Sequence, residues 1–555
     1  MDQGIDWGDL PTWLSSIATV GALLFAAVAA VAAQRVYKIE SERDRVTAEQ
    51  RKEQEAYLRR TQAALVSAWW GHEAGGGWGA FVRNASETPV YQANLTVLDV
   101  HDPDVHERVD LPVIPPAGEP MFRPTGMTDG GGSAADYRVE ITFTDSAGAR
   151  WIRDQQGRLS ELRSEVVIWA DERRARALRG FASEFLATHG VKVRFRTGRI
   201  EALRAELLGA AGSDEVPDIL VGPHDWLGEL VRAGAIEPLA VSQRRRQDFL
   251  PEAVAAMTYQ GELYGVPYAL DTAVLLRHTG LAPEQPATFE QLLATGQALR
   301  ADGRADEVLA MQVGPDGDAY YMYPILVGAG GRLFDRNRGG VLDTGAPAVD
   351  APETVAAFER FRGLGARGAG VLRREIDRER ATELFAAGRT PYLICASRVF
   401  ADLARAGLPF EVGPVPPFEG FGAVRAFSSV HGFFLTRHGP NKTIAQDLAV
   451  HYLTRTEVAL ALYEVQPRPP ALRVALEQVV DTDPRIAAFA AECRNGDLMP
   501  SVPEMPQVWR LLGRAEADLV AGADTAATVR RLAQGLRAAL GAAPRRSAPA
   551  PRAGV

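Results

Sequence analysis

The sequence contains only two cysteines in 555 residues, Cys395 and Cys493. Two cysteines exclude a disulfide framework, and without CxxC spacing they form no thiol redox motif. We expect both to be buried free thiols. The nine histidines form no HExxH group or metal-ligand cluster, and no GxSxG motif occurs. The common metalloprotease and hydrolase signatures are therefore absent. The sequence predicts no metal, no cofactor and no catalytic residues.

The chain also lacks an excess of positive charge. It has 61 Lys and Arg against 70 Asp and Glu, a net charge of −9, so we expect no nucleic-acid partner. The basic run Arg244–Arg246 is predicted to lie on a solvated helix face. Hydrophobic residues make up 46% and charged residues 24%, as in ordinary folded proteins. The length predicts more than one domain.

Charged residues are missing altogether from residues 10–34. This stretch is long enough to cross a hydrocarbon core of ~30 Å as a helix at ~1.5 Å per residue. A secretory signal peptide is the competing interpretation, but its leader should be basic, and residues 1–9 carry three aspartates and no Lys or Arg. The sequence therefore predicts a short N-terminal segment, 1–9, and a retained transmembrane helix, 10–34. The chain would be a single-pass protein of the plasma membrane.

The charges next to this span bear on its orientation. Arg35, Lys38, Arg43 and Arg45 follow it closely, and nothing basic precedes it. The positive-inside rule then places everything after residue 35 in the cytoplasm. From this rule alone the cytoplasmic side is favoured.

Three further segments are defined by composition. Residues 35–66 are charged and free of Gly and Pro, which predicts a helical stalk. Residues 67–162 contain short β-rich runs broken by Pro, Gly and Asp, which predict a small antiparallel β-sandwich serving as a spacer or docking platform. The Pro/Ala-rich tail, 543–555, is predicted to be disordered.

Residues 163–542 read as an α/β domain. VVIWA (166–170) predicts a buried strand, Arg174–His189 a helix that stops at Gly190, and VKVRF and DILVG two further strands. Two α/β lobes joined by crossing strands fit this pattern. Candidate crossings are Ala269–Ala273 and Phe427–Phe433.

The stretch DPRIAAFAAECRNGDLMPSVPEMPQVW runs from Asp483 to Trp509. Asp483 and Pro484 predict a helix start, and Gly496 predicts the helix end. The residues before the next three prolines are expected in extended backbone, and Trp509 is expected to open a new helix. The exposed face of a Trp suits the apolar face of a sugar ring, although core packing is the alternative.

This stretch closely resembles the C-terminal motif of family 1 of the bacterial extracellular solute-binding proteins, of the maltose/maltodextrin-binding type. These proteins are the substrate-binding subunits of ABC importers. The likeness covers about 165–540 and continues upstream through VVIWADE (166–172), EVPDILVGPHDW (215–226), GELYGVPYALDTAVLL (261–276), YPILVGAGG (323–331) and ELFAAGRTPYLI (383–394). The resemblance implies a bilobed, periplasmic-binding-protein-like fold of type II, with a carbohydrate ligand and an ABC permease as partners.

The resemblance also implies a sugar site, because carboxylates accept hydrogen bonds from hydroxyls and aromatic rings stack on sugars. The family's positions match Asp225, Asp271, Asp318, Tyr320, Tyr321, Arg398, Met499, Trp509, Glu172 and Arg173, the last two across a one-residue gap. Two positions depart from the family pattern. Its stacking tryptophans fall here on Gly222, which cannot stack, and on Arg398, which could pair with an acidic sugar or another anion.

The sequence thus predicts a membrane-tethered, oligosaccharide-type solute-binding protein that closes two lobes over a sugar. The alternative is a cytoplasmic-facing ligand-sensing or scaffold protein that reuses the fold without transport. A third interpretation, a glycosidase using Asp271 and Asp318, has no motif behind it. The family resemblance favours the extracytoplasmic side, whereas the charges after residue 34 favour the cytoplasm.

Overall fold

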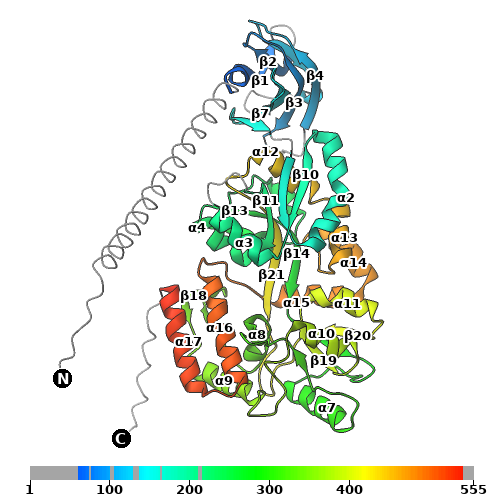
Figure 1. Cartoon of the computed structure of the whole chain (residues 1–555), viewed down its shortest axis with the longest axis vertical. Coiled ribbons are helices and arrows are strands. Elements are labelled where there is room, and N and C mark those ends of the chain that lie inside the picture. Colours follow the sequence, from blue (N-terminus) through cyan, green and yellow to red (C-terminus); the bar gives the residue numbers. More distant parts are fainter. Residues whose placement is uncertain are drawn as a thin grey trace, which may run out of the picture. The chain divides into compact units, whose positions relative to one another are not determined.

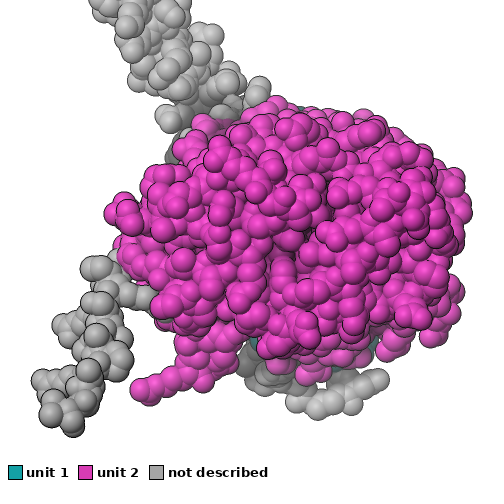
Figure 2. All heavy atoms as spheres, turned by 90° about the horizontal axis from the view of Figure 1, so that it is seen from below, with its two compact units in different colours: residues 1–161 teal, residues 162–555 magenta. Residues whose placement is uncertain are grey.

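The structure of the protein is a computed structural model. It describes residues 60–73, 77–100, 106–128, 137–162, 165–210 and 216–541. The chain divides into two compact units, residues 1–161 and 162–555, which Figure 2 colours separately. The predicted segments 1–9, 10–34 and 543–555 and most of the predicted stalk lie outside the described residues. Among the helices that the structure describes, none is long and apolar enough to cross a membrane.

Unit 1 is built from β-strands, which confirms the β-rich region predicted there. One sheet has the order β1-β2-β5, and the other has the order β4-β3-β6-β7-β8. The elements are β1 (Val66–Glu73), β2 (Gly77–Asn84), β3 (Val90–Asp99), β4 (His106–Ile114), β5 (Met121–Pro124), η1 (Gly126–Thr128), β6 (Tyr137–Thr144), β7 (Arg150–Arg153) and β8 (Leu159–Leu162). Val66 and Val82 of the first sheet and Leu95 and Ile141 of the second belong to one hydrophobic cluster. The two sheets therefore share a core.

The first lobe of unit 2 surrounds a sheet of order β10-β9-β11-β21-β14, with β22 paired to β21. Its strands are β9 (Glu165–Ala170), β10 (Lys192–Thr197), β11 (Ile219–Pro223), β14 (Gly265–Thr272), β21 (Phe427–Leu435) and β22 (Asp497–Leu498). β9, β10 and β11 are parallel and overlap the three strands predicted from sequence. β9 and β11 are largely buried, whereas no residue of β10 is buried. Other elements are α2 (Glu172–His189), α3 (Ile200–Gly209), η2 (His224–Trp226), α4 (Leu227–Arg232), α5 (Gln243–Gln247), α6 (Pro251–Ala256), β12 (Thr258–Tyr259), β13 (Glu262–Leu263), α12 (Lys442–Asp447), η4 (Leu448–Tyr452), α13 (Thr456–Val465) and α14 (Arg473–Thr482).

The second lobe surrounds a smaller sheet of order β16-β19-β15-β20. Its strands are β15 (Val274–His278), β16 (Ala310–Met311), β19 (Tyr392–Cys395) and β20 (Phe410–Gly413), with a separate hairpin of β17 (Phe334–Arg336) and β18 (Leu342–Pro347). Its helices are α7 (Phe289–Ala301), α8 (Ala319–Gly328), α9 (Pro352–Gly363), α10 (Arg378–Ala386), η3 (Ser397–Val399), α11 (Phe400–Arg405), α15 (Pro484–Asn495), α16 (Met505–Val520) and α17 (Thr525–Leu540). One hydrophobic cluster joins α8, α9, α16 and α17 to this sheet.

Two strands connect the lobes where the sequence predicted crossings. β14 belongs to the first sheet and continues through Ala273 into β15 of the second. β21 pairs antiparallel with β14, and every residue of both strands is buried. Figure 1 shows β14 and β21 side by side along the middle of unit 2. Such a pair of buried strands is suited to a hinge, because it holds the lobes together while their facing surfaces stay open.

The stretch from Asp483 follows its predicted course with two corrections. Asp483 caps α15 by accepting from the Arg485 N–H. Gly496 ends this helix as predicted, in extended backbone, where a Cβ would lie 2.7 Å from the Ala426 carbonyl. The corrections concern Met505, predicted to be extended, and Trp509, predicted to open the next helix: α16 begins at Met505, and Trp509 lies within it. The helix tolerates the proline that follows Met505, because its first turn needs no backbone donor.

Candidate ligand-binding cleft

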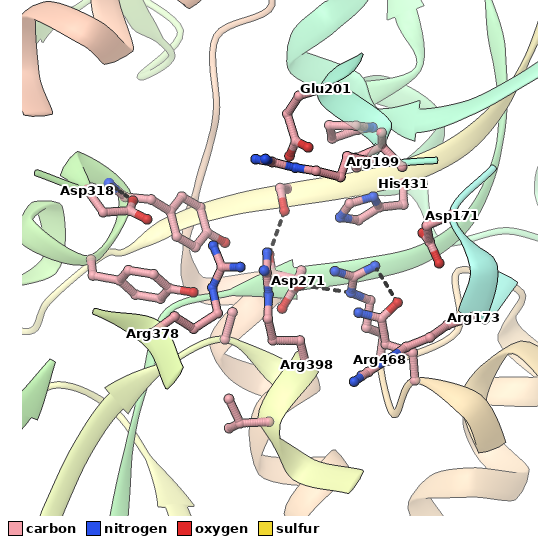
Figure 3. A pocket seen from close by; sticks show the side chains of 18 of the residues that line it. Asp171, Arg173, Arg199, Glu201, Asp271, Asp318, Arg378, Arg398, His431 and Arg468 are labelled. Carbon is pink, nitrogen blue, oxygen red and sulfur yellow. Dashed lines mark hydrogen bonds and ion pairs between the residues drawn. The ribbon is translucent and has the colours of Figure 1, made fainter. Parts of the chain in front are cut away.

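A large cavity of about 1130 Å³ lies in unit 2 and is lined by residues of both lobes. Sites for small ligands occupy roughly 300–1,000 Å³, so this cavity has room for a ligand of several rings. All ten residues predicted from sequence line it: Glu172, Arg173, Asp225, Asp271, Asp318, Tyr320, Tyr321, Arg398, Met499 and Trp509. Figure 3 shows Asp318 and Asp171 at opposite ends of the view, with Asp271 between them.

Asp225 and Trp509 lie together although they are far apart in sequence. The Trp509 Nε1–H donates to Asp225 Oδ2 at 3.2 Å, and the indole packs edge-on against Phe427. Asp225 Oδ1 is buried without a partner among the described residues. Burial raises the pKa of Asp225 above its usual value. A ligand hydroxyl is the kind of donor that this oxygen lacks.

The His224 ring makes two hydrogen bonds that hold the backbone next to Asp225 in place. The Val430 N–H donates to its Nδ1 at 3.1 Å, and its Nε2–H donates to the Met499 carbonyl at 2.9 Å. One nitrogen accepts and the other donates, so the imidazole is neutral. Burial lowers the pKa of His224, in agreement with this state. The contact also ties the predicted residue Met499 to strand β21.

Asp271 is engaged within the protein. Its Oδ2 accepts from Arg468 Nε at 2.8 Å, and its Oδ1 accepts from the backbone N–H groups of Thr272 and Ser397. Both side chains of the ion pair are almost fully buried. The carboxylate at the end of β14 therefore holds the second lobe and the segment before α14 together. Whether it also contacts ligand stays a prediction.

Asp318 caps α8, the helix that carries the two predicted tyrosines. Its Oδ2 accepts from Gln312 Nε2 at 2.6 Å, and its own N–H donates to Glu516 Oε2 at 2.6 Å. Burial raises the pKa of Asp318. The rings of Tyr320 and Tyr321 meet edge to face, with centroids 5.5 Å apart. Burial raises the pKa of both phenols, so both are neutral hydrogen-bonding groups at physiological pH.

Glu172 and Arg173 open helix α2 at the edge of the cavity. Glu172 accepts from Arg179 at 3.0 Å, and this contact lowers its pKa. Both side chains of that pair are about half exposed, so the interaction is weak. Their position on the cavity wall agrees with the predicted site, but their contact with a ligand stays a prediction.

Several lining residues were missed from sequence. The set comprises Asp171, Arg174, Arg199, Glu201, Trp226, Arg378, Ser429, His431 and Arg468. His431 lies on the predicted crossing strand, now β21, so the prediction of that strand could have indicated that His431 lies near the site. Trp226 directly follows Asp225 and packs over Gly222, where any Cβ would collide with the indole. The Trp226 indole therefore fills the space beside Gly222.

His431 and Arg174 form a buried polar group beside the hinge. The Arg174 guanidinium donates to Tyr268, to Asp171 and, at 3.4 Å, to His431 Nδ1. Burial, and then the charges of Arg468 and Arg174, lower the pKa of His431 well below its usual value. His431 is therefore neutral and keeps an Nε2–H donor. Among the described residues no group of His, Cys, Asp and Glu side chains is arranged to hold a metal ion.

Comparison with known proteins identifies the class that this fold and cleft define. Residues 180–488 match the family model described as "Bacterial extracellular solute-binding protein", which is more than half of the chain. The chain belongs to this family. The match confirms the prediction of a binding protein rather than an enzyme.

Individual relatives are more distant. A "Maltotriose-binding protein" of Pyrococcus abyssi is 25% identical over 355 residues, 62% of this chain and 75% of the relative. A "Galactooligosaccharide-binding protein" of Bacillus subtilis is 25% identical over 356 residues, 62% of this chain and 82% of the relative. The solved structure of a Thermus thermophilus maltotriose-binding protein has a TM-score of 0.61 at 24% identity, covering 68% of this chain and all of that one. The similarity to maltodextrin-type binding proteins and the bilobed α/β fold are confirmed.

Proposed function

We propose that unit 2 binds an oligosaccharide in the cleft and closes its two lobes over it. The observation that carries this is the pairing of Trp509 with Asp225, whose second oxygen is buried and has no donor in the described part of the chain. A sugar ring offers an apolar face to an indole and hydroxyls to a carboxylate. The names of the relatives, for maltotriose and galactooligosaccharides, support the same class of ligand.

Closure follows from the position of the cleft. Its lining comes from α2 and η2 of the first lobe and from α8, α10 and η3 of the second. A ligand that contacts both walls has more interactions in the closed form, and this difference in affinity drives closure. Asp225, Asp271, Asp318, Tyr320, Tyr321, Arg398, Met499, Trp509, Glu172 and Arg173 are the proposed contacts.

We further propose that residues 10–34 tether the protein to the plasma membrane and that the closed form docks on an ABC permease. This role requires the domain to lie outside the cytoplasm. The basic residues from Arg35 to Arg45 favour the opposite side, and with it a cytoplasmic ligand-sensing or scaffold role.

Protease added to intact cells, with the outer wall removed, distinguishes the importer role from the cytoplasmic role. Digestion of the region after residue 60 supports the importer role. Protection until lysis contradicts that role and leaves a tethered sensing module.

Calorimetric titration of the full-length chain in detergent micelles tests the binding function. We expect one oligosaccharide to bind per chain, from a panel of linear neutral and acidic trisaccharides. The absence of any saturable binding across the panel would contradict the proposal.

A further inference from the structure

Six arginines line the cleft, and four of them make no ion pair with a carboxylate of the described residues. Arg174 pairs with Asp171, and Arg468 pairs with Asp271. The structure gives no ion pair within the described residues to the other four, which are Arg173, Arg199, Arg378 and Arg398. Arg173 and Arg199 belong to the first lobe, Arg378 and Arg398 to the second. Figure 3 shows Arg199 and the pair of Arg378 and Arg398 on opposite sides of the cavity.

Arg398 is the least exposed of the four arginines. It lies in η3 and is only partly exposed, and its Nε is buried without an acceptor among the described residues. A guanidinium carries five donors and stays charged, so a buried one requires acceptors, and a carboxylate satisfies it best. An unsatisfied buried donor of this kind is destabilising in the absence of a ligand.

Arg378 is held in place beside it. Its Nε donates to Gln312 Oε1 at 3.0 Å, and the Gln312 amide donates to Asp318. These two contacts orient the side chain, and neither Nη group of Arg378 hydrogen-bonds to another of the described residues. Figure 3 shows Arg378 and Arg398 directed into the same part of the cavity.

The acidic residues of the cleft are not all free to balance these charges. Five of them are ion-paired, namely Asp171, Glu172, Asp271, Glu383 and Asp402. Of the other four, Glu201 and Glu379 are exposed, as are Arg173, Arg199 and Arg378, so solvent and salt screen all of these charges. Asp225 and Asp318 are buried, which raises the pKa of each carboxyl, and the charges of Arg378 and Arg398 lower the pKa of Asp318. Arg398 is thus the least screened of the four arginines, and Asp225 Oδ1 is a buried acceptor without a donor among the described residues.

We propose that the cleft binds an acidic oligosaccharide, with a ring carboxylate of the sugar seated on Arg398 and Arg378. This inference rests on the oligosaccharide function proposed above and names its substrate class. The sugar hydroxyls would donate to Asp225 Oδ1, which lines the same cavity. Bound negative charge also reduces repulsion between the arginines of the two lobes, so ligand charge and lobe closure are coupled.

The test compares sugars that differ only in charge. Trisaccharides of galacturonate, mannuronate and guluronate are titrated into the full-length chain in detergent micelles, each beside the neutral trisaccharide obtained by reducing its carboxyls to alcohols. We expect at least one acid to bind about tenfold or more tightly than its reduced form, and the difference to shrink as salt is raised from low to high concentration.

Variants assign the effect to the arginines. Arg398→Gln and, separately, Arg378→Gln should weaken binding of the acid by about ten- to a hundredfold and change binding of the neutral sugar little. Arg531→Gln is the matched control, because Arg531 on α17 is exposed and paired with Asp518, and neither residue lines the cavity. Its affinity should equal that of the unmodified chain.

The outcomes separate this inference from the function on which it rests. Binding of neutral trisaccharides with no preference for the acids would overturn the inference and leave the proposed function standing. An acid preference that both Arg398→Gln and Arg378→Gln retain, in folded variants with an unchanged melting curve, would also overturn it. If neither kind of sugar binds, both proposals are wrong.

Discussion

Replacing Arg468 with methionine tests how the hinge is held. The side chains of Arg468 and Asp271 are 5% and 6% exposed, and the ion pair is 2.8 Å long. Methionine fills much of the same volume, so the change removes the charge and the hydrogen bond rather than packing. The variant leaves a buried carboxylate without its counter-charge.

The magnitude follows from this burial. Breaking a buried ion pair by removing one partner typically lowers the free energy of unfolding by about 3–5 kcal/mol. Asp271 keeps the backbone N–H groups of Thr272 and Ser397, so we expect a loss near the lower end, about 3 kcal/mol. The double variant Arg468→Met with Asp271→Asn should recover part of the loss, because it buries no charge.

Denaturant unfolding of the full-length chain, followed through the transition of unit 2, measures the change. Arg405→Met is the control, since its partner Asp402 and Arg405 itself are 39% and 77% exposed. Such a surface pair contributes about 0–1 kcal/mol. If Arg468→Met costs no more than this control, the pair does not stabilise the hinge and the reasoning is wrong.

Three further predictions concern the cleft. Trp509→Ala removes the ring and should weaken sugar binding by about 1–3 kcal/mol of binding free energy, measured by calorimetry, and Trp509→Phe should weaken it less. Full-strength binding by Trp509→Ala rules out the site. Burial and then Asp318 raise the pKa of Glu516. The folded state therefore binds more protons than the unfolded state above the unfolded pKa of about 4.3, and stability falls as pH rises towards the folded pKa. Thermal melts of Glu516→Gln should lack this fall, and parallel profiles for the two proteins would contradict it. Gly317 and Gly303 both have left-handed backbone, with φ of 75° and 71°, which costs a side chain about 1–2 kcal/mol at either position. A Cβ at Gly317 would also collide with the Gly513 carbonyl, whereas a Cβ at Gly303 would meet open space. Gly317→Ala should therefore lower the melting temperature more than Gly303→Ala.

Local signals explain which elements could be predicted. The strands β9 and β11 are largely buried hydrophobic runs, and α2 carries its own start at Asp171 and stop at Gly190. These patterns depend on neighbours in sequence, so composition and periodicity reveal them. Strand β1, VSAWWGHE, lies within the predicted β module except for its first residue, Val66, which was assigned to the adjoining charged stalk.

The cleft shows the limit of such signals. Carrying over family positions placed Asp225, Asp318 and Trp509 on the same cavity, but it did not reveal their partners. Arg468 meets Asp271 across 197 residues of sequence, and nothing in the proline-rich segment around it indicates a buried cation. Such contacts depend on how the lobes fold back on each other, which a linear pattern does not contain.

The central claim is that the cleft between the lobes binds an oligosaccharide. Its most direct measurement is a calorimetric titration of the full-length chain and of Trp509→Ala with the trisaccharide panel. The account predicts saturable binding of one sugar per chain, and a matching loss of affinity in Trp509→Ala while its melting curve stays close to that of the unmodified protein. Absence of binding by the unmodified chain, or equal binding by both proteins, would contradict it.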